Sequence, residues 1–294
     1  MQKVVGKVGY LANICSNIKS AMAIINIEKA RFEKQFPEEN EKQEAQQVKI
    51  SFLSLRCRRD LRFIRSVLAS IQKHPIPLES YSRQPKLTAG ILVYGDASGK
   101  TDDLEDPAAL GIYIPQQHRI SALALSYILP IFWLLAKDGV SVNKDNTVLL
   151  EILSLLTLLV EFPFLFQNQS VIFVTDSMAF SQLYKKLWAK SESTAYVLRT
   201  LNFITQSLNI SLDVVWRRRR SNKFTRIADD LTHSNFKNIH SSVKSRRVST
   251  LPEPILDSLL SSCNMVHHTY GNMVENIKKF WNRNNFQYNG CSFY

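Results

Sequence analysis

The chain has 294 residues, of which 45% are hydrophobic, and a formal net charge of +12. This apolar fraction is ordinary for a globular protein and excludes wholesale disorder, while the positive charge favours a polyanionic partner such as nucleic acid. The four cysteines lie far apart, without a Cys-x-x-Cys pair, which excludes a disulfide scaffold and fits reduced thiols.

Two helical stretches are predicted near the start of the chain. Residues 1 to about 35 are expected to be helical because apolar residues recur at three- and four-residue steps over residues 4–18. A second helical stretch is expected from about residue 50 to residue 72, with an apolar face over residues 53–71. A polar run separates the two stretches, and the segment 74–86, with its three prolines, ends the unit. We therefore expect a small helical domain at residues 1–85.

Short β-rich runs and helical runs alternate from about residue 90 onward. Strands are expected at residues 91–98, 109–115, 119–127, 170–177 and 210–220, and helices at residues 149–162, 179–190, 191–209 and 224–233. The resulting order, β-β-β-α-β-α-α-β-α, predicts an α/β domain with a mixed five-stranded sheet and flanking helices. We place this domain at residues 86–240, followed by a C-terminal tail at residues 241–294 with two candidate helices.

The most apolar stretch, residues 149–166, contains Glu151, Glu161 and Pro163. A membrane span of about 20 apolar residues does not readily accommodate these residues. The first residues also lack the continuous apolar core of a signal peptide. We therefore expect no membrane partner, and a cytoplasmic or nuclear protein rather than a secreted one.

Four carboxylates stand at the ends of separate predicted elements. Asp96 and Asp176 each end a strand, Glu151 opens an apolar helix, and Asp229 stands near the start of another helix. Singly, each is explained by a turn aspartate or by an acidic residue in a first helical turn. Together they form a set of hard oxygen ligands, which suits magnesium or manganese rather than zinc. Two such ions about 4 Å apart can activate a water and stabilise the leaving oxygen of a phosphodiester.

The ordered motifs YGDASG, LLEILS, FVTDSMAF and RIADDLTH resemble the four-part signature of retroelement ribonucleases H. The resemblance covers about half of the chain and implies a ribonuclease-H-like fold. It also implies a metal-dependent endonuclease that cuts the RNA strand of RNA–DNA hybrids with two Mg²⁺ or Mn²⁺ ions. The implied catalytic and metal-binding residues are Asp96, Glu151, Asp176 and Asp229.

Some positions bear on how far this resemblance reaches. Asp229 is preferred over Asp230 because Ala228 precedes it, as in the family's Ala-Asp pair. Thr225 stands where many relatives have Asn, and the segment 217–221 replaces their usual His-Gly segment. These departures leave the implied metal ligands intact but put the catalytic help of this loop in doubt.

The segments KVVGKVGYLANI and RRDLRFIRSVLASI are similar to thumb and connection helices of retroelement reverse transcriptases, most nearly those of DIRS-type elements. The resemblance implies that the polymerase palm and fingers belong to the rest of a longer polyprotein. The YGDA sequence at Tyr94 is similar to the polymerase YxDD box, but Ala97 replaces the second carboxylate. Polymerase activity is therefore not expected from this chain alone.

Basic residues flank the predicted acidic site. The tract 217–220 is placed to contact phosphates, and Trp216 before it is placed to stack on a base or sugar. The family places a hybrid-binding helix near Lys185 and Lys186, although both the tract and these lysines can also be explained as solvated surface. The candidate nucleic-acid-binding residues are Trp216, Arg217, Arg218, Arg219, Arg220, Lys185 and Lys186.

Two other functions compete with a nuclease. A non-catalytic nucleic-acid-binding or scaffold module derived from a retroelement would be favoured by the loss of a ligand, and none of the four is missing. An integrase-like DNA transferase generally has three acidic ligands, and the fourth match counts against it.

Overall fold

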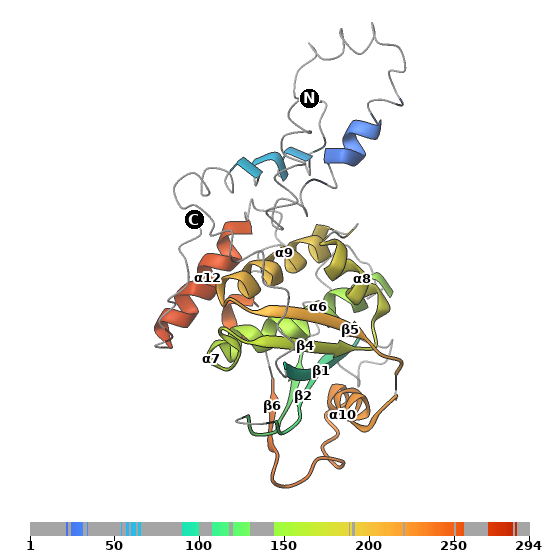
Figure 1. The fold of residues 1–294 in the computed structure, drawn as a ribbon, viewed down its shortest axis with the longest axis vertical. Helices are drawn as coiled ribbons and strands as arrows, with labels where there is room; N and C mark the ends of the chain where they lie inside the picture. Colours follow the sequence, from blue (N-terminus) through green and yellow to red (C-terminus); the bar gives the residue numbers. More distant parts are fainter. Residues whose placement is uncertain are drawn as a thin grey trace, which may run out of the picture. The chain divides into compact units, whose positions relative to one another are not determined.

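The computed structural model describes residues 22, 25–31, 34, 54, 57–58, 60–62, 64–65, 90–99, 108–117, 120–129, 144–187, 189, 192–219, 221–249, 251–255, 270–284 and 286. The chain divides into two compact units (Figure 1). The first comprises Met1–Gln84 and Cys291–Tyr294, and the second comprises Pro85–Gly290.

The described part of the first unit is largely helical. Residues 25–31, 57–58, 60–62 and 64–65 are in α-helix, within or beside the stretches whose apolar periodicity predicts one. Met22, Ile25, Cys57 and Ile64 are buried, as the apolar positions of amphipathic helices are. The first part of the stretch expected to be helical, residues 1–21, lies outside the described residues.

A mixed sheet forms the centre of the second unit. Within the described residues its strands are β1 (Ile91–Ser98), β2 (Ala109–Ile114), β3 (Leu123–Ile128), β4 (Ser170–Thr175), β5 (Ser211–Trp216) and β6 (Lys244–Val248). Their order is β5-β4-β1-β2-β3-β6. The first three strands form an antiparallel meander, whereas β4 runs parallel to β1, β5 to β4 and β6 to β3. The predicted ribonuclease-H-like α/β fold is confirmed, with one strand more than the five expected.

Helices cover both faces of this sheet (Figure 1). They are α6 (Lys144–Glu161), α7 (Pro163–Phe166), α8 (Met178–Lys186), α9 (Glu192–Ser207), α10 (Lys223–Thr232) and α12 (Tyr270–Arg283). α6 packs against β1 and β2 on one side and α9 on another, which explains why its residues 149–160 are all buried. No helix in the described residues is both long and apolar enough to cross a membrane.

α10 lies on the opposite face of the sheet, where it contacts β1, β2 and β3. The contact is close at Gly111 on β2, where a Cβ atom would lie 2.1 Å from the carbonyl oxygen of Ala228. Only glycine leaves room for the helix backbone at this distance. Because Gly111 pairs with Asp96 across the sheet, this close packing brings α10 next to the acidic end of β1.

The sixth strand is one feature that sequence analysis assigns to the tail. The segment Lys244–Val248 is basic and almost wholly exposed, so it lacks the apolar alternation that predicts a strand. Polar contacts hold β6 in the sheet instead. Arg246 Nη1 donates to Glu161 Oε1 at 2.6 Å, and the Tyr127 hydroxyl donates to the other carboxylate oxygen of Glu161. β6 therefore forms through long-range contacts rather than through local sequence.

The end of the chain also contributes to the second unit. α12 packs against α9, and Ile277 and Trp281 belong to the hydrophobic core of the sheet domain. Trp281 is only 1% exposed, and its indole Nε1 donates to the carbonyl oxygen of Val160 at 2.8 Å. The segment expected as a separate tail thus supplies both a strand and a core helix.

Candidate metal centre

Asp96 and Asp176 come from neighbouring parallel strands. Tyr94 of β1 pairs with Val174 of β4, so the two aspartates, each two residues further along, are level at the carboxyl ends of these strands. Open α/β sheets bind ligands at this edge. Asp96 is 5% exposed, and its Oδ1 accepts a hydrogen bond from the backbone N–H of Ala97 at 2.9 Å.

Glu151 reaches the same place from α6. The helix begins at Lys144, so the expectation that Glu151 opens it is wrong: the polar residues Lys144 to Thr147 form its first turn. A favourable interaction with the helix dipole falls off within the first turn and does not explain this carboxylate. Glu151 is 1% exposed, and Thr175 Oγ1 donates to its Oε2 at 2.8 Å.

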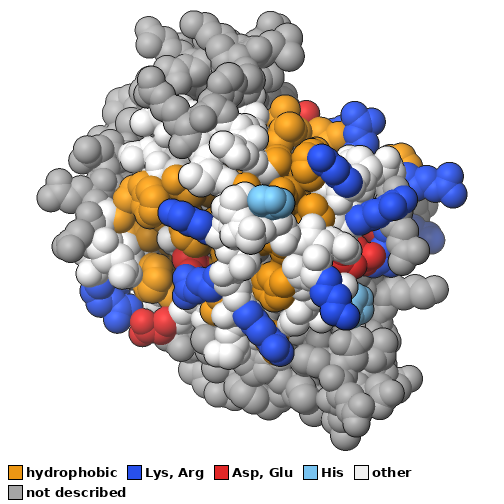
Figure 2. Space-filling view, turned by 90° about the horizontal axis from the view of Figure 1, so that it is seen from below, with side chains coloured by type: hydrophobic (Ala, Val, Ile, Leu, Met, Phe, Trp, Pro, Cys, Tyr) orange, Lys and Arg blue, Asp and Glu red, His pale blue; other side chains and the backbone are white. Residues whose placement is uncertain are grey.

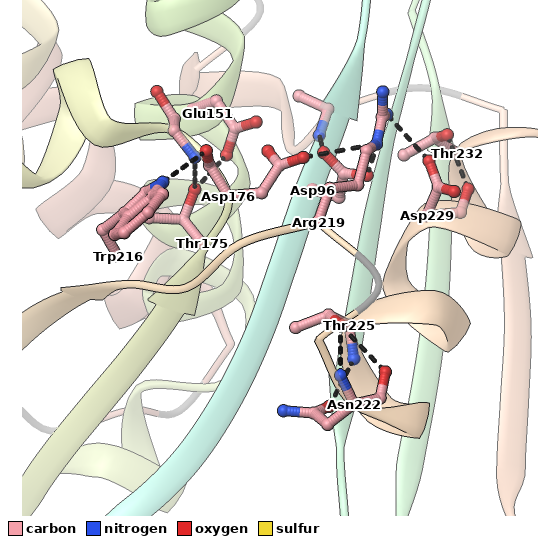
Figure 3. Close-up of polar contacts among 12 residues, drawn as sticks. Asp96, Glu151, Thr175, Asp176, Trp216, Arg219, Asn222, Thr225, Asp229 and Thr232 are labelled. Carbon is pink, nitrogen blue, oxygen red and sulfur yellow. Dashed lines mark hydrogen bonds and ion pairs between the residues drawn. The ribbon is translucent and has the colours of Figure 1, made fainter.

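The three carboxylates meet in a compact group. One oxygen from each of Asp96, Glu151 and Asp176 lies within 4.8 Å of the other two. Figure 3 shows these side chains converging from β1, α6 and the end of β4. Three carboxylate oxygens at such spacing are a hard donor set that fits Mg²⁺ or Mn²⁺.

The fourth predicted ligand, Asp229, is not a member of this compact group. It lies in the second turn of α10 rather than at its start, because the helix begins at Lys223. The N-cap is Asn222, whose side chain accepts from the backbone N–H groups of Phe224 and Thr225. Thr225, the residue that departs from the family pattern, completes this capping box and thereby fixes the start of the helix that carries Asp229.

Arg219 joins Asp229 to the other aspartates. Its Nη2 lies 2.8 Å from Asp229 Oδ1 and 3.6 Å from Asp96 Oδ2. Its Nε lies 3.3 Å from Asp176 Oδ2. In Figure 3 the guanidinium lies between Asp96 and Asp229. The sequence predicts a phosphate contact for Arg219, whereas the structure places it against the carboxylates.

Burial and like charge raise the pKa of each carboxyl in the compact group. Burial first, and then the charge of Asp176, raises the pKa of Asp96 from 3.8 to about 7, although Arg219 opposes the change. The pKa of Glu151 is raised well above its usual value by burial and by Asp96. Burial also raises the pKa of Asp176 against the effect of Arg219. A divalent cation would relieve this electrostatic cost.

The other candidate nucleic-acid-binding residues lie at the end of β5, in the segment after it and in the last turn of α8. Trp216 is 41% exposed, and its indole Nε1 donates to the backbone oxygen of Asp176 at 3.1 Å. Arg217 and Arg218 are exposed just after β5, and Lys185 and Lys186 are exposed in the last turn of α8. Arg220 lies outside the described residues. Their contacts with nucleic acid stay predictions.

Sequence reasoning misses two residues that shape the site. Thr175 holds Glu151, and its hydroxyl also accepts from the backbone N–H of Ser177. The sequence signal for this role was a threonine within an apolar run, directly before Asp176. Gly111 permits the approach of α10, but a glycine inside a strand signals only some close contact, not which one.

No family model matches the chain, and no curated protein does. The chain is similar to the solved structure of a ribonuclease H1 isolated from compost by a metagenomic approach, with 16% identity and a TM-score of 0.33. It is also similar to a ribonuclease H1 from the halophilic archaeon Halobacterium salinarum, with 14% identity and a TM-score of 0.32. Each match covers 48% of this chain, and 91% and 92% of the respective relative. The fold assignment itself rests on the strand order and directions described above.

Proposed function

We propose that the second unit is a metal-dependent endonuclease that cuts the RNA strand of RNA–DNA hybrids as part of a retroelement reverse transcriptase. One observation carries the proposal: Asp96, Glu151 and Asp176 converge from three elements with ligand oxygens within 4.8 Å. Three like charges, two of them buried and the third partly buried, are costly to assemble. A protein that retains them without a cation gains no stability from doing so.

The roles of the carboxylates follow from their positions. Asp96 and Asp176, level on neighbouring strands, would bind both ions, while Glu151 and Asp229 would each complete one coordination shell. Two Mg²⁺ or Mn²⁺ ions supply the activation of water and the stabilisation of the leaving oxygen. Thr175 keeps the Glu151 carboxylate oriented through its hydroxyl, as residues behind metal ligands commonly do.

Substrate binding would depend on basic and aromatic residues around the site. Figure 2 shows Lys and Arg side chains spread across one face of the molecule, with few acidic ones among them. Such a surface suits a phosphate backbone without sequence preference. We expect the choice of hybrid to rest on its shape and on the 2′-hydroxyl groups of the RNA strand.

The retroelement setting rests on the motif resemblance. It implies a polymerase palm and fingers region as the covalent partner of this chain, and a cytoplasmic or nuclear place of action. Neither statement is needed for the nuclease proposal, which depends only on the acidic centre and its surroundings.

One observation favours the alternative of a non-catalytic nucleic-acid-binding or scaffold module. Arg219 already pairs with three of the four carboxylates, so the centre is partly neutralised from within the chain. Under this alternative the acidic residues would be structural, and the folded protein would bind hybrid without cutting it.

A cleavage assay separates the two functions. A hybrid labelled on either strand is incubated with Mg²⁺, Mn²⁺ or chelator, and we expect metal-dependent cuts in the RNA strand only. Asp176→Asn should reduce cleavage by several orders of magnitude while hybrid binding stays nearly intact. The neighbouring pair Asp229→Asn and Asp230→Asn provides a matched control, because only the first is expected to impair cleavage. Wild-type protein that is folded and binds hybrid but cuts nothing with either metal would support the scaffold alternative.

A further inference from the structure

Arg219 makes an unusual set of contacts for a residue in a basic surface tract. A single guanidinium reaches carboxylate oxygens on Asp96, Asp176 and Asp229, at 3.6, 3.3 and 2.8 Å respectively. Two of these residues belong to the compact group that could hold a metal ion. A cation bound by these carboxylates and the Arg219 guanidinium would therefore compete for the same negative charge.

The position of Arg219 allows it to leave. It lies in a turn after β5 and before α10, outside any helix or strand, and its side chain is 57% exposed. By contrast, the side chains of Asp96, Asp176 and Asp229 are 7%, 22% and 15% exposed. An arginine that moves into water recovers its hydration, whereas the three carboxylates, which are much less exposed, need another cation.

The electrostatics agree with this exchange. Burial acts to lower the pKa of the Arg219 guanidinium, but the surrounding carboxylates outweigh burial and raise it. The same arginine opposes the rise in the pKa of Asp96 and of Asp176. Arg219 thus stabilises the charged form of the carboxylates that a divalent cation would need.

We propose that Arg219 is an exchangeable counter-ion, which holds the carboxylates of the metal-free protein and must leave them when a divalent cation binds. This inference rests on the proposed metal site but adds a regulatory element to it. Metal affinity is then set partly by the cost of releasing Arg219. The release also frees Asp229, which Arg219 joins to the other aspartates, to become a ligand.

The size of the effect follows from the occupancy of the ion pairs. The apparent dissociation constant of a ligand rises by the inverse of the fraction of molecules competent to bind it. If Arg219 is paired in about nine molecules of ten, its removal should lower the Kd for the metal by about tenfold. Removal should also make the metal-free protein less stable, because Asp96, Asp176 and Asp229 lose their ion pairs with Arg219.

The test is a calorimetric titration of Mn²⁺ into the full chain, together with thermal unfolding in chelator and in Mn²⁺. Arg219→Gln should bind Mn²⁺ about tenfold more tightly than wild type, unfold at a lower temperature in chelator, and show a larger rise in Tm on metal addition. Arg219→Lys keeps the positive charge but not the forked contacts, so its affinity for Mn²⁺ should lie between those of wild type and Arg219→Gln. It also keeps the test possible if Arg219→Gln does not fold. Arg226→Gln, which removes one exposed arginine charge from α10, is the control and should bind Mn²⁺ as wild type does.

The outcomes separate this inference from the proposed function. Equal or weaker Mn²⁺ binding by both Arg219 variants than by wild type would overturn the counter-ion role while leaving the metal site in place. Failure of wild type and all variants to bind Mn²⁺ would overturn the metal site and the exchange with it. Mn²⁺ binding by the Arg219 variants alone would support the exchange in its strongest form.

Discussion

The buried carboxyl group of Asp96 should make the metal-free protein less stable as the pH rises. Burial first, and the charge of Asp176 second, raise the pKa of this carboxyl from 3.8 to about 7 in the folded chain. Between these values the folded state holds a proton that the unfolded state has lost. Stability therefore falls as the pH rises from about 4 to about 7, and levels off above that.

The pKa values give the size of this effect. Each tenfold difference in proton affinity corresponds to about 1.4 kcal/mol, so Asp96 alone should cost about 3 kcal/mol between pH 5 and pH 8. Asp96→Asn removes the charge and keeps the shape. Because nearly the whole rise in pKa counts against wild type at pH 8, the metal-free variant should there be roughly 4 kcal/mol more stable than wild type. Glu151 and Asp176, whose pKa values are also raised, account for the dependence that remains.

Urea unfolding in chelator, followed by tryptophan fluorescence, measures these differences. All four tryptophans of the sequence lie in the range of the second unit, so their emission reports on the unit that holds Asp96. Asp213→Asn, at an exposed position of β5, is the control for the loss of one carboxylate charge. Two results would refute this explanation. One is a wild-type free energy of unfolding that stays constant from pH 5 to pH 8. The other is a loss of unfolding free energy in Asp96→Asn, over the same pH range, as large as the loss in wild type.

Three further perturbations test other parts of the account. Gly111→Ala should cost about 1–3 kcal/mol in urea unfolding, because its Cβ would meet a backbone oxygen of α10 at 2.1 Å; an unchanged midpoint would contradict that close packing. Trp281→Phe should cost about 1–3 kcal/mol through the lost hydrogen bond to Val160, and a variant as stable as wild type would show that α12 does not dock. Neutralising Arg217 and Arg218 should flatten the log–log salt dependence of hybrid binding by about one unit per lost phosphate contact, whereas an unchanged slope would identify both as solvated.

The parts of the site on neighbouring strands could be predicted from the sequence. Asp96 and Asp176 each follow a short β-rich run and precede a small residue, Ala97 or Ser177, which marks the carboxyl end of a buried strand. Glu151 was recognisable as a charge among leucines, although its place along α6 was misjudged. A local pattern shows where a strand ends more clearly than where a helix begins.

The remaining features depend on contacts that are distant in sequence. β6 has no apolar alternation and is held by Arg246 through Glu161, 85 residues away. Trp281 bonds to Val160 across 121 residues. Arg219 lies in a run of four arginines, and nothing in that run distinguishes the one that turns back to the aspartates. Such pairings are set by the assembled sheet, so local periodicity does not reveal them.

The most direct test of the metal centre is a crystal structure with Mn²⁺, in which anomalous scattering locates the ion. We expect an anomalous peak roughly 2.1 Å from carboxylate oxygens of Asp96 and Asp176. The Arg219 guanidinium should have moved away from both aspartates. Well-ordered carboxylates without a peak at high Mn²⁺ concentration, and with Arg219 still in contact with them, would contradict this expectation.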